Sequence, residues 1–210
     1  MTMRVLFDGA GDVTEKYLPG AVYLILGTSG AAVSLALGQS PVSMPPWLPI
    51  GPETGVWASV AMGVCLAGAT IVATRFLVER FAWARELHVE LRPVVRRLRS
   101  SWIVATALAS GMAEEVIFRG ALLQALGGIV GLVVSSVAFG ALHQVRGGAR
   151  WVWAVWATIM GLLLGSVFGL TGSLVGPILA HVAINAVNLR FLRDHEIPPS
   201  PRPSPGGGGG

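Results

Sequence analysis

Long apolar segments alternate with short polar ones along this chain, and their lengths predict membrane-spanning helices. A helix needs about twenty apolar residues to cross a hydrocarbon core about 30 Å thick. The segments of suitable length and composition are Gly20–Gly38, Gly55–Thr74, Ser101–Leu126, Ile129–Val145, Trp151–Leu170 and Ser173–Leu192. The expected fold is therefore all-α: a polytopic membrane helix bundle of about six transmembrane helices, formed by residues 1–192 as a single domain.

Polar segments separate these spans. Gln39–Thr54 is predicted to be a proline-rich loop, and Arg75–Ser100 carries seven arginines and three glutamates. Apolar residues are interleaved with those charges, so Arg75–Ser100 has two interpretations: an amphipathic helix on the inner leaflet, or a solvated extension of the flanking helices. His88, within it, is expected at the surface. Residues 193–210 are rich in proline and glycine and are expected to be a disordered tail.

The distribution of basic residues predicts the orientation. Apart from Arg119, every lysine and arginine lies near the N-terminus, in Arg75–Ser100, around Arg146–Arg150, or from Arg190 onward. An even number of spans places all of these segments on one side, and the loops on the other side hold no base. Positive residues stay in the cytoplasm. Both termini should therefore be cytoplasmic, in a multi-pass protein of a bacterial cytoplasmic (inner) membrane.

Composition agrees with this and excludes other classes. Hydrophobic residues make up 53% of the chain and charged residues 12%, whereas a soluble domain carries about a quarter charged residues. The pI near 10.2 does not indicate nucleic-acid binding, because the bases cap apolar segments. The single cysteine, Cys65, excludes a disulfide framework; it lies in an apolar run and is expected to be buried.

Two adjacent carboxylates interrupt the third predicted span. An ionisable group in the middle of a membrane costs several kcal/mol, so Glu114 and Glu115 require an explanation. Arg119 follows Glu115 by four residues, and the two can pair on one helix face. Glu114 points about 100° away from that face. It is either available to a cavity or part of a buried ion-pair cluster that holds helices together.

Further polar residues lie in the fourth and sixth spans. His143 follows Phe139 by four residues, and Asn185 follows His181 by four residues. With Glu114, such side chains can deprotonate a water, polarise a carbonyl and hold an oxyanion. A glutamate and two histidines are also a plausible three-ligand metal set with one open position. The structural alternative is that each histidine only makes a hydrogen bond between helices.

In this order, each on its own predicted membrane helix, these residues resemble the three motifs of the CPBP family. That family comprises CAAX prenyl endopeptidases and bacteriocin-processing or bacteriocin-immunity (Abi) membrane proteins. The resemblance covers about Ser101–Leu192. The matching motifs are Glu114-Glu115-x-x-x-Arg119, Phe139-x-x-x-His143 and His181-x-x-x-Asn185.

The resemblance implies an intramembrane endopeptidase acting on a membrane-associated protein or peptide. Carried over by position, Glu114 and His143 would activate the attacking water, and His181 and Asn185 would stabilise the oxyanion. The Glu115–Arg119 pair would orient Glu114, with Phe139 in support. For Glu114 and His143 to lie at the same depth in the membrane, the third helix is expected to begin outside the membrane near Pro93. This leaves a cavity open to the cytoplasm and inner leaflet.

Two alternatives stay open. The family has been described both as metalloproteases and as metal-independent glutamate proteases. The metal-free version is slightly favoured here, while a Zn²⁺ ion would take Glu114, His143 and His181 as ligands. The other alternative is a non-catalytic membrane protein, for bacteriocin immunity or as a scaffold, that uses the polar cluster structurally. The expected partners are the lipid bilayer and a membrane-associated substrate, and not nucleic acid.

Overall fold

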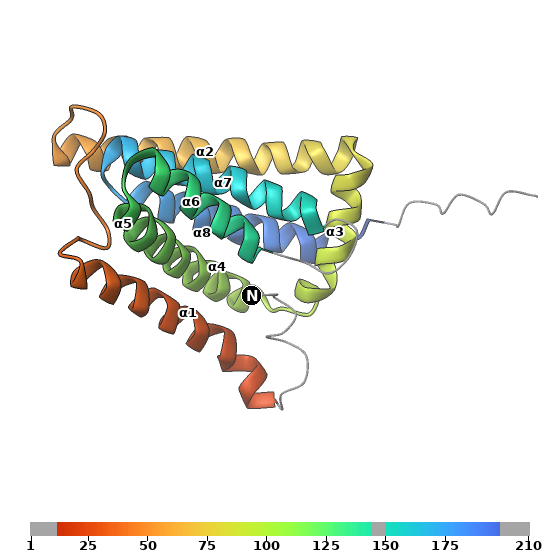
Figure 1. Cartoon of the computed structure of the whole chain (residues 1–210). Helices are drawn as coiled ribbons and strands as arrows, with labels where there is room; N and C mark the ends of the chain where they lie inside the picture. The colour runs from red at the N-terminus through yellow and green to blue at the C-terminus, as the bar shows by residue number, and fades with distance from the viewer. Residues whose placement is uncertain (1–11, 144–149, 198–210) are drawn as a thin grey trace, which may run out of the picture.

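The computed structural model describes residues 12–143 and 150–197, and residues 12–19 by their backbone only. Every regular element in these ranges is a helix, so the all-α prediction is confirmed (Figure 1). Helices α4, η2 and α5 follow one another without a break and form one rod. The elements are α1 (Asp12–Ala36), α2 (Pro52–Arg80), α3 (Ala82–Val95), α4 (Ser100–Glu115), the π-helix η2 (Val116–Leu123), α5 (Gln124–Leu126), α6 (Gly128–Leu142), α7 (Arg150–Thr171) and α8 (Val175–Asp194).

Four of these helices are long and apolar enough to cross a membrane. They are α2, the rod Ser100–Leu126, α7 and α8. The other two predicted spans correspond to shorter apolar helices, Gly20–Ala36 and Gly128–Leu142. At 1.5 Å per residue, α6 is roughly 22 Å long, less than a full hydrocarbon core. The chain is thus an integral membrane protein with four helices of full spanning length among its described residues.

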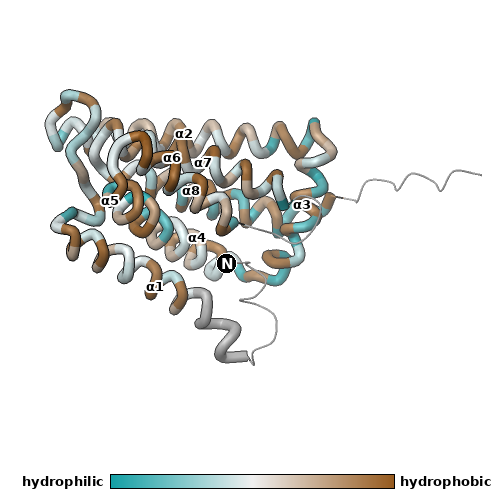
Figure 2. The backbone as a smooth tube through the Cα atoms, viewed as in Figure 1, coloured by the Kyte–Doolittle hydropathy of each residue, from teal (hydrophilic) through white to brown (hydrophobic). Residues whose placement is uncertain are grey.

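Many large apolar side chains lie on the outer surface of the bundle, as expected for a protein surrounded by lipid. Leu24, Val64, Val72 and Val130 are all well exposed. Figure 2 shows hydrophobic residues distributed along the length of the long helices. Cys65 belongs to this surface, so the prediction that it is buried was wrong. In a membrane protein the apolar residues of a span face lipid as readily as the core.

The helices pack through small residues. Helix α2 runs along α8, α4 also packs on α8, α6 packs on α7, and α1 lies against α4 and η2 (Figure 1). At the α2–α8 contact, Gly63 meets the backbone of Gly176 so closely that a Cβ on either would collide with the opposing helix. Small residues of this kind are typical where membrane helices approach closely.

One end of the bundle, here called the loop end, is closed by the loop of residues 37–51. The Met44 N–H donates to the Gly172 carbonyl at 2.9 Å, and the Trp47 N–H donates to the Gly169 carbonyl at 2.8 Å. Gln124, on α5, donates to the Ser40 carbonyl at 2.8 Å. The predicted proline-rich loop therefore joins α5 to the α7–α8 turn, which fixes the helices relative to one another.

Helix α3 lies across the opposite end, here called the α3 end (Figure 1). Phe81 has an extended backbone between α2 and α3, so Arg75–Ser100 is not a continuous extension of its neighbours. The apolar face of α3 buries Leu87 and Leu91 against Trp153 and Leu192. A separate amphipathic helix is thus confirmed. Its apolar face packs on α7 and α8.

His88 is on that buried face, which corrects the expectation of a surface position. Its side chain is 3% exposed. The ring Nε2–H donates to the His195 carbonyl at 2.9 Å, and the ring packs edge-on against Phe191 at 5.2 Å between centroids. The residues are separated by about a hundred positions in sequence, so no local pattern predicts this contact.

Several predicted boundaries moved. Helix α4 begins at Ser100 and not near Pro93. Pro93 lies inside α3, and the helical backbone is interrupted between the end of α3 and Ser100. Helix α8 continues to Asp194, where Arg193 donates to the Ser100 Oγ at 3.0 Å; the predicted end at Leu192 was two residues short. Residues 198–210 of the tail expected at 193–210, and residues 146–149 of the turn expected at Arg146–Arg150, lie outside the described residues.

Candidate active site

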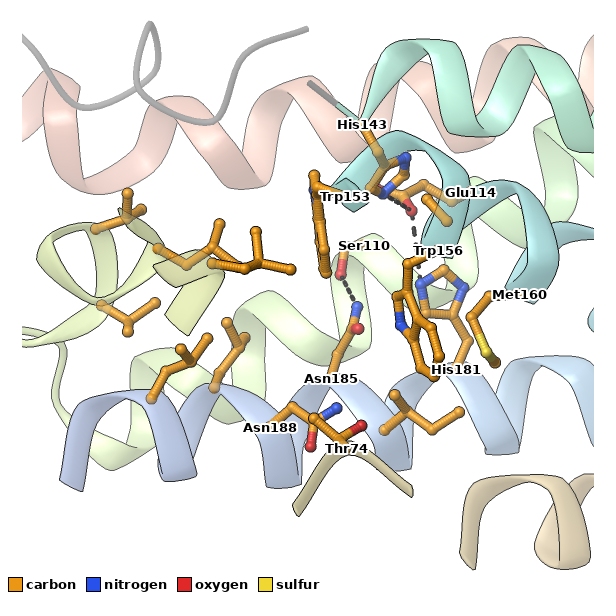
Figure 3. A pocket seen from close by; sticks show the side chains of 18 of the residues that line it. Thr74, Ser110, Glu114, His143, Trp153, Trp156, Met160, His181, Asn185 and Asn188 are labelled. Atoms are coloured by element: carbon orange, nitrogen blue, oxygen red, sulfur yellow. Dashed lines mark hydrogen bonds and ion pairs between the residues drawn. The ribbon is translucent and has the colours of Figure 1, made fainter. Parts of the chain in front are cut away.

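Three side chains predicted from the motifs converge at the centre of the bundle. The Oε2 of Glu114 lies 3.6 Å from the Nε2 of His143 and 3.6 Å from the Nε2 of His181 (Figure 3). The Glu114 side chain is 13% exposed, and its Oε2 is buried with no hydrogen-bond partner among the described residues. Glu114 is the last but one residue of α4, His143 follows α6 directly, and His181 is on α8. Tertiary packing therefore brings them together.

Each histidine is oriented through its other ring nitrogen. The Nδ1 of His143 is 2.8 Å from the Phe139 carbonyl, and the Nδ1 of His181 is 2.8 Å from Glu115 Oε1. Carbonyl and carboxylate oxygens only accept, so Nδ1 carries the proton in both rings. In a neutral ring the Nε2 that faces Glu114 is then an acceptor. The space between the three groups suits a donor such as water.

Glu115 and Arg119 form the ion pair that their spacing predicts. Arg119 Nη1 donates to Glu115 Oε1 at 2.9 Å, and both side chains are completely buried. Arg119 Nη2 also donates to the Gly161 carbonyl on α7 at 3.1 Å. Since Glu115 accepts from His181 as well, the pair links α4, α7 and α8. It holds the His181 ring in place without itself facing the cavity.

Phe139 packs between these groups. Its ring centroid is 4.2 Å from that of His143 and 5.8 Å from that of His181. The Arg119 guanidinium lies 4.7 Å from the Phe139 centroid, within the usual range of a cation–π contact. Phe139 is 3% exposed. Its place in the motif is thus explained by packing, because its ring contacts both histidines and the Arg119 guanidinium.

The π-helix η2 begins directly after Glu115 and was not predicted from the sequence. π-helical turns frequently occur at functional sites. Gly120, within η2, lies so close to the Pro41 carbonyl that a Cβ there would collide with it. The π-helix η2 therefore packs against the loop of residues 37–51 through Gly120, and it also contains Arg119.

Ser110 is a site residue that the motifs did not reveal. Asn185 Nδ2 donates to Ser110 Oγ at 3.1 Å, which orients the amide toward the same cavity (Figure 3). Ser110 is 3% exposed. Ser110 precedes Glu114 by four residues on α4, so the two side chains share one helix face. That spacing could have predicted Ser110 as a residue of the site.

A cavity of about 490 Å³ connects these groups with the α3 end. Glu114, His143, His181 and Asn185 line it, and apolar side chains of α3 and aromatic residues of α7, Trp153 and Trp156, form much of the remaining wall (Figure 3). Leu87, His88 and Leu91 of α3 also belong to its lining. The site is thus a mostly apolar pocket with a few convergent polar groups, the usual character of a ligand-binding site.

The donors predicted for zinc are of suitable types, a carboxylate oxygen and two imidazole nitrogens. Nevertheless, among residues 12–143 and 150–197, no group of three or more His, Cys, Asp or Glu side chains is arranged to hold a metal ion. Glu114, His143 and His181 would be the ligands of a zinc ion at this point; the chemistry below is derived from the side chains themselves.

Comparison with known proteins identifies the segment that carries the motifs. Residues 97–187 match the family model of the Rce1-like type II CAAX prenyl endopeptidases. The chain is also 36% identical over 85 residues to the uncharacterized protein YpbD of Bacillus subtilis (strain 168). That match covers 40% of this chain and 42% of YpbD. No solved structure matches the chain.

The family match contains the whole polar site. It begins just before α4 and ends two residues after Asn185, so all three motifs fall inside it. Helices α1, α2 and α3 lie outside it. The resemblance inferred from the motifs is confirmed: residues 97–187 of this chain are similar to the Rce1-like type II CAAX prenyl endopeptidases.

Proposed function

We propose that this protein is an intramembrane endopeptidase that hydrolyses a peptide bond in a membrane-associated protein or peptide. One observation carries the proposal: a buried carboxylate oxygen, Glu114 Oε2, faces two imidazole nitrogens and no hydrogen-bond donor among the described residues. Two acceptor nitrogens and a carboxylate around one point favour a bound water. That water would lie beside a cavity able to admit a peptide.

Glu114 and His143 activate the water in this proposal. The water oxygen attacks the carbonyl carbon of the scissile bond, and its proton passes to the Glu114 carboxylate. When the tetrahedral intermediate collapses, the carbon–nitrogen bond breaks and the proton moves from Glu114 to the leaving amine nitrogen. His143, held by the Phe139 carbonyl, accepts a hydrogen bond from the water and fixes its position.

His181 and Asn185 stabilise the oxyanion. Asn185 uses one amide N–H for Ser110, which leaves its second N–H for the developing negative charge. His181 donates its Nδ1–H to Glu115, which holds its Nε2 toward the reacting water. The Nε2 of the neutral ring accepts a hydrogen bond from the water, and in the imidazolium form its N–H is directed at the oxyanion.

The topology completes the proposal. We infer six spans with both termini in the cytoplasm of a bacterial cell, because the basic residues collect on one side of the predicted spans. The shorter apolar stretches Gly20–Ala36 of α1 and Gly128–Leu142 of α6 would then cross as parts of the bundle, with their backbone polar groups hydrogen-bonded within each helix. With this orientation the α3 end and its cavity face the cytoplasm and inner leaflet.

The test is cleavage of a membrane-peptide library by the purified protein in detergent, read by mass spectrometry. Glu114→Gln keeps the size of the side chain but removes the base, and we expect cleavage to fall by roughly 10²–10⁴-fold. The matched control is Glu53→Gln, the same change at an exposed glutamate at the start of α2. It should cleave like wild type.

A chelator arm distinguishes the mechanisms. Cleavage that is unaffected by a strong chelator agrees with the glutamate mechanism, whereas cleavage lost to the chelator and restored by zinc would place Glu114, His143 and His181 around a metal. Equal cleavage by wild type and Glu114→Gln contradicts the proposal. Loss of folding in Glu114→Gln, seen as a lower melting temperature, would instead favour the scaffold or immunity alternative.

A further inference from the structure

The side chain of Arg75, on α2, lines the same cavity as Glu114. It contacts α8 near Asn188, whereas Glu114 lies near His181 on that helix. Arg75, near the end of α2, faces the cavity together with Thr74 and Asn188. Its Nη1 donates to Asn188 Oδ1 at 3.0 Å and its Nη2 to the Val187 carbonyl at 3.3 Å. Its guanidinium lies 3.6 Å from the centroid of the Phe191 ring. In the sequence, Arg75 is one of the basic residues predicted to lie on the cytoplasmic side.

The charge of Arg75 has no acidic partner in the part of the chain that the structure describes. The ion pairs there involve Arg92, Arg119, Arg193 and the histidines, and none involves Arg75. Two of its five N–H donors are used by α8 in those described contacts, which leaves three. A half-buried guanidinium with free donors is suited to a carboxylate, which it can bind in bidentate fashion.

Polar side chains connect Arg75 with the catalytic groups. His181, Asn185 and Asn188 are spaced by four and three residues, so they follow one face of α8, and all three line the cavity (Figure 3). From His181 to Asn188 the helix rises about 10 Å. An extended peptide covers that length with about three residues. The asparagine amides between the two ends can hydrogen-bond the peptide main chain.

We propose that Arg75 and Asn188 form a carboxylate-binding subsite that positions the substrate about three residues away from the bond that is cleaved. This inference rests on the proposed peptidase function. The carboxylate belongs either to the C-terminus of the substrate or to an aspartate or glutamate side chain, and both offer the same chemistry to the guanidinium. Arg75 acts as a positioning and specificity residue.

The test uses sets of peptides that differ only in charge. One pair carries a free C-terminal carboxylate or a C-terminal amide three residues after the cleaved bond. A second pair, with a longer chain, carries Glu or Gln at that position. We measure kcat and KM for cleavage by wild type, and binding of fluorescent versions to Glu114→Gln by anisotropy. At least one charged peptide should have a KM and a Kd about tenfold or more below those of its neutral partner.

Variants of Arg75 then assign the preference. Arg75→Gln should reduce the ratio of charged to neutral affinity to about one, and Arg75→Lys should retain part of it. Arg80→Gln is the matched control: Arg80 is exposed, on the same helix, and outside the cavity lining. It should keep the full ratio. Because the ratio is taken within one protein, a uniform loss of stability in Arg75→Gln does not imitate the effect.

The outcomes separate the two proposals. Equal affinities of wild type for charged and neutral peptides, or a preference that persists in Arg75→Gln, would overturn the subsite. If no peptide is cleaved but the charged peptides bind more tightly to Glu114→Gln, and less tightly once Arg75→Gln is added, the subsite stands and the peptidase function fails. The two peptide pairs show whether the subsite binds a C-terminal carboxylate or an acidic side chain.

Discussion

The two ends of the bundle differ in how completely they are packed. At the loop end, backbone hydrogen bonds join the loop of residues 37–51 to the α7–α8 turn, and glycines bring helices into contact with opposing backbone. At the α3 end, the helices diverge around a cavity of about 490 Å³ that α3 covers. A firmly joined end can hold the helices in place while the other end stays open to a ligand.

Glu115 and Glu114 lie at the boundary between these regions. Glu115 is fully buried and paired with Arg119 and His181, whereas Glu114 faces the cavity with a buried oxygen that has no hydrogen bond among the described residues. Adjacent helical residues point about 100° apart. One helical turn therefore supplies a buried carboxylate that is paired with Arg119 and a second carboxylate that faces the cavity. The comparison predicts that substitutions on the two sides will have different kinds of effect.

The largest expected effect is on stability, from Arg119→Ala. This change leaves the completely buried Glu115 without its ion partner and removes the link to the Gly161 carbonyl. Breaking a buried pair by removing one member costs about 3–5 kcal/mol. We expect a large fall in the unfolding free energy, measured by denaturation of the purified protein in detergent or by resistance to proteolysis.

Glu114→Gln is the internal control for that prediction. It alters the neighbouring carboxylate, yet we expect its stability to stay within about 1 kcal/mol of wild type, because Glu114 forms no buried ion pair with an arginine. Comparable destabilisation by both variants would mean that the two glutamates act as a single structural cluster. The distinction between the two regions would then be wrong.

An intermediate effect is expected from Gly120→Ala at the loop end. The added Cβ would collide with the Pro41 carbonyl, and overpacking of a tight contact costs roughly 1–3 kcal/mol. Gly68→Ala, on α2, is the control, because a Cβ there has nothing within 4 Å. By helix propensity it should be neutral or stabilising by up to about 1 kcal/mol. Thermal unfolding of both variants beside wild type measures the difference; a Gly120→Ala protein as stable as Gly68→Ala would show that the loop end is not firmly packed.

The smallest effect is a pH dependence that comes from the α3 end. Burial lowers the pKa of His88 below its usual 6.5 and outweighs the hydrogen bond to the His195 carbonyl, which raises it; the nearby charges of Arg92 and Arg75 also lower it. The unfolded chain therefore binds a proton at His88 more readily than the folded protein. Stability should be fully present above pH 6.5 and should fall as the pH drops from about 6.5 toward the lower folded-state pKa.

His88→Gln isolates this contribution. Glutamine can still donate to the His195 carbonyl but does not titrate, so the fall in melting temperature between pH 7.5 and pH 5.5 should be smaller than in wild type. The other histidines are present in both proteins and cancel in the comparison. An identical pH dependence in the two proteins would show that His88 does not contribute.

Local pattern was enough to predict several features, and its limits are visible in particular residues. The Glu115–Arg119 pair follows from a spacing of four on one helix, and the structure has it at 2.9 Å. Cys65 was placed in the core because its segment is apolar, but an apolar segment in a membrane protein does not say which face meets lipid. The predicted start of α4 near Pro93 failed because α3 is a helix of its own.

The sequence by itself determined that this is an all-helical membrane protein with polar motifs on three helices, because length, hydropathy and i to i+4 spacing are local properties. Only the tertiary structure decided that Glu114 Oε2 lies 3.6 Å from both histidines, that Ser110 orients Asn185, that His88 is buried, and that Arg75 faces the cavity. These contacts join residues far apart in the chain. They depend on how whole helices cross, which no short segment of sequence specifies.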